Sequence, residues 1–203
     1  MRDQKKHITK QGFDMIFTEG LRSFTVDRLS SVLRMSKKTI YSLFSTKEIL
    51  IEQIIKYKLR SIESEIEGIL KKNKCPILSF YEINQLQIKT SADIDVNKLV
   101  ELKVKYPQIW ARIERHRRKG VIALESIFTD AKKLNYLRKD LEIKLISNLY
   151  INIIDRTFQP EFFIQQEVSL KDTIELFAGI MAKGIFNQEG IAILENIKKR
   201  NLK

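Results

Sequence analysis

The segment TVDRLSSVLRMSKKTIYSLF, residues 25–44, decides the fold of this 203-residue chain. Thr25 and Ser36 each precede residues with the apolar spacing of a short helix, so each is a candidate N-cap. The stretch between the two helices, residues 33–36, has the length of a tight turn. Two short helices joined in this way make a helix-turn-helix, which we expect at residues 26–44.

The second helix of this pair has the chemistry of a DNA recognition helix. Ile40 and Phe44 lie four residues apart and are expected to face inward. An α-helix fits the major groove of DNA, where outward polar side chains read base edges. Two alternatives are an ordinary solvated helix start and, for the tyrosine, a packing role. The side chains expected to face outward are Lys37, Lys38, Thr39, Tyr41 and Ser42.

Apolar periodicity predicts helices along the rest of the chain, which has few glycines and prolines to interrupt them. We expect an all-α protein in which residues 1–46 form a three-helix DNA-binding bundle. Residues 47–203 would form a larger helical domain for ligand binding and dimerisation. The basic tail, 195–203, is expected to fray. The further helices are predicted at 4–18, 47–72, 77–89, 94–104, 108–133, 140–158 and 169–187.

Composition favours an acidic partner inside the cell. The chain carries 37 Lys and Arg against 25 Asp and Glu, a formal net charge of +12, which favours nucleic acid or an anionic membrane surface. A merely basic soluble protein is the alternative. No apolar run approaches the ~18 residues of a membrane span, and the N-terminus does not have the pattern of a signal peptide. We therefore expect a cytoplasmic protein without a membrane partner.

The chain offers little to a catalytic or metal site. One cysteine excludes an internal disulfide, and two distant histidines leave no metal-ligand spacing. The sequence has no Gly-rich phosphate loop, Cys-x-x-Cys, His-Glu-x-x-His or Gly-x-Ser-x-Gly motif. We expect no catalytic residue, metal or cofactor, and an enzyme is the least favoured of the functions considered.

Residues 8–52 resemble the DNA-binding signature of the TetR family of transcriptional regulators. The resemblance is carried by Gly20, by Thr-Val five residues on, by SKKTIYSLF and by KEIL at 47–50. Two positions depart from the family pattern. Gly12 stands where the family usually has alanine, and Arg34 stands where the turn usually has glycine. If Arg34 keeps a positive φ, it costs about 1 kcal/mol of strain.

The resemblance implies which residues touch DNA. Phosphate contacts would come from Thr25, Tyr41 and Lys47. Lys47 stands at a helix N-terminus, where the helix dipole does not favour a cation, so a phosphate partner explains it better. Contacts to bases or nearby phosphates would come from Lys37, Lys38, Thr39 and Ser42.

The family architecture also implies a homodimer on a palindromic operator and a small-molecule effector that relieves repression. KYPQIW at 105–110 weakly resembles the effector domain, where Trp110 and Phe128 are candidate pocket residues; a plain core role is the alternative. Activation instead of repression, or control by a protein partner without any small ligand, stays open. The helices at 140–158 and 169–187 would form the dimer seam, with Leu149, Ile153, Phe177, Ile180 and Met181 as its candidates.

Overall fold

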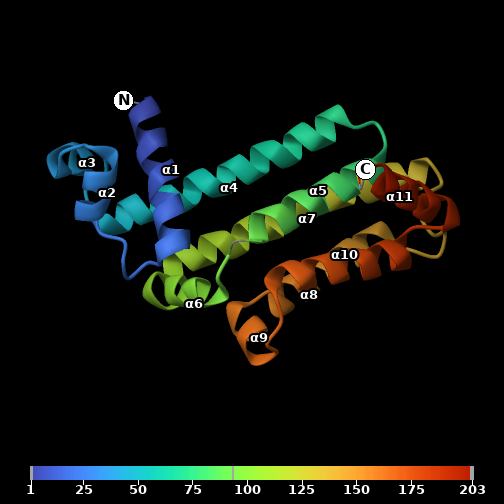
Figure 1. Ribbon diagram of the computed structural model, residues 1–203. Coiled ribbons are helices and arrows are strands. Elements are labelled where there is room, and N and C mark those ends of the chain that lie inside the picture. The colour runs from blue at the N-terminus through green and yellow to red at the C-terminus, as the bar shows by residue number, and fades with distance from the viewer. Residues whose placement is uncertain (1, 93, 202–203) are drawn as a thin grey trace. The chain divides into compact units, whose positions relative to one another are not determined.

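The protein is all helical in the part that this computed structural model describes, residues 2–92 and 94–201 (Figure 1). Those residues contain no strand beyond one isolated backbone pairing, Leu137 with Phe186. The predicted all-α class is confirmed. The helices are α1 (Arg2–Glu19), α2 (Val26–Leu33), α3 (Lys37–Leu43), α4 (Lys47–Lys72), α5 (Pro76–Ser91), α6 (Val96–Lys105), α7 (Pro107–Lys133), α8 (Ile143–Thr157), α9 (Pro160–Gln165), α10 (Leu170–Ile185) and α11 (Gln188–Asn201).

The helices form two compact units whose boundary differs from the predicted one. The first unit holds α1–α3, α4 as far as Ser64, α6, and α7 as far as Ile113. The second unit holds the rest of α4 and α7 together with α5 and α8–α11. The sequence placed the boundary at residues 46/47, where α4 begins. The structure divides α4 further along, because the first half of α4 supplies core residues to the first unit.

The core of the first unit explains why four helices hold together there. Ile8 of α1, Leu29 of α2, Ile40 of α3 and Ile54 of α4 are all fully buried in one apolar cluster. Each comes from the apolar stripe of its helix, as the spacing predicts. Burying such side chains contributes about 1.5–3 kcal/mol each. The helix-turn-helix therefore packs against α1 and α4.

A sequence-distant helix also holds the end of α1. Lys98 of α6 donates from Nζ to the carbonyl oxygens of Phe17 at 3.0 Å and Thr18 at 2.6 Å. These carbonyls belong to the last turn of α1, where helix carbonyls lack intrahelical partners and a cation is favoured. Gly20 follows with φ +91°, a conformation that glycine adopts without strain. The contact spans about eighty residues of sequence, and no local pattern indicates it.

The second unit has its own apolar core, and two of its helices were not predicted. α9 begins at Pro160, which the sequence analysis read only as a break between helices. α11 overturns the expectation of a frayed tail for residues 195–201, while residues 202–203 lie outside the described part. Leu194 is buried, and Ile191 and Ile197 pack against the same core, so their burial anchors this helix.

Candidate nucleic-acid interface and ligand cavity

Side-chain caps fix the starts of α2 and α3. The Oγ1 atom of Thr25 accepts a hydrogen bond from the Arg28 amide at 3.2 Å. The Oγ atom of Ser36 accepts one from the Thr39 amide at 3.0 Å. Both predicted N-caps are confirmed. The Thr25 hydroxyl accepts through a lone pair here, so its proton can still be donated to a phosphate oxygen.

The turn between these helices contains a non-glycine residue with a left-handed backbone. Arg34 has φ 51° and ψ 41°, so the conditional expectation of a positive φ is confirmed. The Met35 amide donates to the Ser30 carbonyl at 3.0 Å, and Ser30 Oγ donates to the Met35 carbonyl at 2.6 Å. These bonds hold the turn in place despite a strain of about 1 kcal/mol. The Arg34 side chain is exposed.

The faces of α3 divide as a recognition helix requires. Ile40 is fully buried and Phe44, which follows the helix, is 3% exposed. Tyr41 is 44% exposed although it is aromatic. Lys37, Lys38 and Ser42 are exposed, and Thr39 is half-buried. None of the predicted reading residues is packed inside the protein.

The hydroxyl groups along α3 have defined roles. Ser36 Oγ and Thr39 Oγ1 are 2.8 Å apart and share one hydrogen bond. Ser42 Oγ donates to the Thr39 carbonyl at 2.8 Å, so its proton is used within the helix. Its lone pairs stay available. Ser42 is therefore suited to accept a hydrogen bond from an adenine or cytosine amino group in the major groove.

The lysines named by the resemblance differ in what they already contact. Lys37 Nζ lies 2.5 Å from Asp27 Oδ1, and this hydrogen bond, together with the charge of Asp27, raises the pKa of Lys37. Lys47 Nζ lies 5.8 Å from the centroid of the Phe24 ring, within cation–π range. Lys38 has no ion pair among the described residues. Lys37 and Lys47 thus both have contacts within the protein.

Arg34 is a further candidate for contact with DNA that the sequence did not lead us to name. It is exposed, has no ion pair within the described part of the chain, and stands two residues before Ser36. Two steps of chain span under ~8 Å, which places Arg34 beside the start of α3. The sequence signal was present, since an arginine in a turn that favours glycine is unusual, but it was interpreted only as strain.

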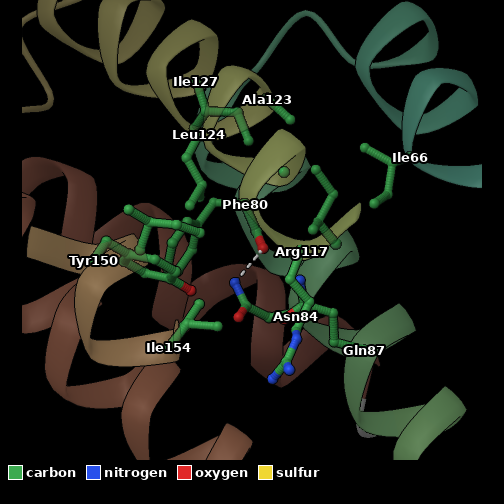
Figure 2. A pocket seen from close by; sticks show the side chains of 13 residues that line it. Ile66, Phe80, Asn84, Gln87, Arg117, Ala123, Leu124, Ile127, Tyr150 and Ile154 are labelled. Atoms are coloured by element: carbon green, nitrogen blue, oxygen red, sulfur yellow. Dashed lines mark hydrogen bonds between the residues drawn. The ribbon is translucent and has the colours of Figure 1, made fainter. Parts of the chain in front are cut away.

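Neither candidate pocket residue lines the cavity that we describe in the second unit. Trp110 is buried in the first unit, with Lys103 Nζ 5.6 Å from its ring centroid. Phe128 is fully buried in the second unit, where its ring meets Phe186 edge to face at 6.5 Å. A cavity of about 50 Å³ lies elsewhere in the second unit, lined by residues of α4, α5, α7 and α8 (Figure 2).

Helices α8 and α10 expose large apolar side chains. Leu149 is 52% exposed, Ile153 39% and Ile180 58%. Two residues that the sequence analysis did not name share this character, Leu145 on α8 and Leu176 on α10. By contrast, Phe177 and Met181 are half-buried and pack against the core of the second unit; the Phe177 ring lies 4.8 Å from that of Tyr150. We call the five exposed residues Leu145, Leu149, Ile153, Leu176 and Ile180 the α8–α10 apolar face.

No helix in the described part of the chain is both long enough and apolar enough to cross a membrane. Within residues 2–92 and 94–201, no group of three or more His, Cys, Asp or Glu side chains is placed to hold a metal ion.

An all-helical chain with an N-terminal helix-turn-helix and a larger helical second unit has the fold of the TetR-family transcriptional regulators, which is the fold that the sequence resemblance implies. A TetR transcription regulator from Haloarcula marismortui has this fold, with a TM-score of 0.73 and 15% identity over 92% of this chain and 100% of that one. A putative transcriptional regulator from Saccharomonospora viridis, solved in complex with choline, gives 0.71 and 11% over 93% and 100%.

Sequence comparison agrees with the structural one. The chain is 22% identical over 192 residues to an uncharacterized HTH-type transcriptional regulator, YvaF, of Bacillus subtilis (strain 168). That alignment covers 91% of this chain and 96% of the relative. No family model matches the chain.

Proposed function

We propose that this protein is a cytoplasmic transcriptional regulator that binds a palindromic operator as a homodimer. The observation that carries the proposal is the outward face of α3, where Lys38, Tyr41 and Ser42 are exposed while Ile40 is buried beneath them. A short helix with a cationic, hydrogen-bonding outer face is what the major groove accommodates. The relatives, which are transcriptional regulators, support this function rather than an enzymatic one.

The α8–α10 apolar face supports the homodimer. Monomeric soluble proteins rarely expose large contiguous apolar patches, and such patches mark protein interfaces. A two-fold dimer that binds a palindromic site needs its two copies of α3 about one DNA turn apart, ~34 Å. Phe177 and Met181 are half-buried and pack against the core of the second unit, so we do not count them in this face.

The proposal also includes a small-molecule effector that relieves repression. Repression relieved by a ligand requires a cavity that differs between two states of the protein. The cavity of about 50 Å³ is well below the ~300 Å³ of a drug-sized ligand site. A regulator controlled by a protein partner is therefore a real second candidate. A small molecule that binds the second unit and changes operator affinity would favour control by a ligand over control by a protein partner.

The test is footprinting of genomic fragments by the purified full-length protein, followed by titration of one bound fragment at several salt concentrations. We expect a protected site with two-fold symmetry. If the dimer neutralises 6–10 phosphates, affinity should fall by about 10³–10⁵ between 50 and 200 mM salt. Absence of any protected fragment, or a flat salt response, would contradict the proposal.

A further inference from the structure

The cavity in the second unit is polar at one end and apolar at the other. Figure 2 shows Arg117, Asn84 and Gln87 grouped together, and Leu124, Ile127 and Ala123 away from them. A site with a few convergent polar groups and otherwise apolar walls fits a ligand with the same division. The apolar part of the wall includes Phe80, Ile83, Leu124, Ile127, Ile151 and Ile154.

Tyr150 places a hydroxyl group at this cavity without a protein partner. Its side chain is 2% exposed, it lines the cavity, and no hydrogen bond from its hydroxyl to another described residue is recorded. Buried tyrosine hydroxyls ordinarily have a partner. Burial raises the pKa of Tyr150, so the phenol keeps its proton at neutral pH and can donate it. A ligand in the cavity is one group that this hydroxyl can donate to, and water is the other.

Arg117 supplies the charge in the cavity wall. Its Nη1 atom donates to the Phe158 carbonyl at 2.6 Å, which fixes the position of the guanidinium. Burial lowers the pKa of Arg117, and the charges of Glu114 and Asp155 oppose that shift. An arginine keeps its charge even so. Arg117 is the one charged side chain in the lining of this cavity.

Gly120 keeps part of the cavity open. It lies in the middle of α7, and an added Cβ would meet nothing within 4 Å. Glycine inside a helix costs about 1 kcal/mol relative to alanine. The chain bears this cost at a position in the cavity lining, and we expect an added side chain there to narrow the cavity.

We propose that this cavity binds an amphipathic organic anion, with its carboxylate toward Tyr150 and Arg117 and its apolar part against Phe80, Leu124 and Ile127. Only the claim that this anion is the effector rests on the proposed function. Binding itself can be measured without DNA. A space of about 50 Å³ admits roughly four water-sized groups, so longer chains require the apolar walls to move apart.

The experiment measures binding of butyrate, hexanoate and octanoate, each beside the alcohol of the same length, to the full-length protein by calorimetry. We expect one or more acids to bind at least about tenfold more tightly than the matched alcohol, because a charge-assisted hydrogen bond is lost with the carboxylate. Equal affinities for acid and alcohol, or no binding of any acid, would overturn the proposal.

Variants locate the site. Tyr150→Phe keeps the ring and should weaken the acid about tenfold and the alcohol by less, because a hydrogen bond to a carboxylate is stronger than one to a hydroxyl. Arg117→Met also removes the bond to Phe158, so Tyr150→Phe is the decisive variant.

Gly120→Ala should raise Tm by about 2–4 °C without ligand and weaken acid binding. Gly68→Ala, at an equally open and exposed glycine of α4 outside the cavity lining, should raise Tm and leave binding unchanged. Unaltered acid binding in Tyr150→Phe and Gly120→Ala would overturn the assignment.

The failures of the two proposals are distinguishable. If the acids bind but no operator exists, the DNA-binding proposal fails while the cavity assignment stands. If an operator is protected and no acid binds, the cavity assignment fails alone. An acid that binds and shifts operator affinity, with the shift lost in Tyr150→Phe, supports both.

Discussion

Gly12 of α1 lies directly against Ile54 of α4. A Cβ atom added at Gly12 would lie 3.0 Å from Cγ1 of Ile54 and closer still to Cδ1, with the Phe24 ring at 3.7 Å. The glycine that departs from the family pattern therefore allows a close approach of two helices in the first unit. Its cost in helix propensity is offset by this packing.

Replacement of Gly12 by alanine should destabilise the protein. Alanine gains about 1 kcal/mol in helix propensity but forces Ile54 to move, and overpacking costs about 1–3 kcal/mol. The double variant Gly12→Ala, Ile54→Val removes the Cδ1 methyl and should recover part of the loss. Urea unfolding of the two single variants and the double variant measures the coupling. A Gly12→Ala protein more stable than the parent would show that Ile54 moves without cost.

Arg34 should combine a stability cost with a DNA contact. Arg34→Gly relieves the left-handed backbone and should stabilise the protein by about 1 kcal/mol. It also removes an exposed cation beside α3, so we expect weaker operator binding and a salt slope smaller by about 1 per subunit. Arg34→Lys keeps the charge and the strain and should resemble the parent in both measurements. If Arg34→Gly bound the operator as tightly as the parent, Arg34 would have no role at DNA.

Lys47 and Lys38 should affect DNA binding in different ways. Lys47→Ala should weaken binding to operator and unrelated DNA alike, since a phosphate contact carries no sequence information. Lys38→Ala or Thr39→Ala should change which sequence is preferred. Binding selection on randomised half-sites distinguishes the two effects. Because Lys47 also lies near the Phe24 ring, its variant needs a parallel unfolding measurement. The same effect from both lysine variants would refute this division of roles.

A charge on the α8–α10 apolar face should separate the subunits. Leu149→Glu and Ile180→Glu replace side chains that are 52% and 58% exposed, so neither should disturb the fold of one chain. In a dimer, each would bury an unpaired charge and favour monomers. Val104→Glu, at a 73% exposed apolar position on α6, is the matched control. Sedimentation equilibrium should give monomers for the two variants and dimers for the control. A dimer in every case would place the interface elsewhere.

Local patterns determined most of the helices and the exposed face of α3. The N-caps at Thr25 and Ser36 and the spacing of Ile40 and Phe44 depend on neighbours within four residues, so the sequence specifies them directly. α11 was missed for the opposite reason. Its tail looks basic and polar, and only the burial of Leu194 against residues far along the chain makes it a stable helix.

The sequence by itself determined that the chain is helical and that one two-turn helix presents lysines and hydroxyls outward, because caps and apolar periodicity act over a few residues. Only the tertiary structure decided that Lys98 holds the end of α1, that Lys37 pairs with Asp27, and that Tyr150 and Arg117 meet at one cavity. Those pairings depend on which faces of distant helices come together. That choice is set by the packing of the whole core, to which each residue contributes only a small part.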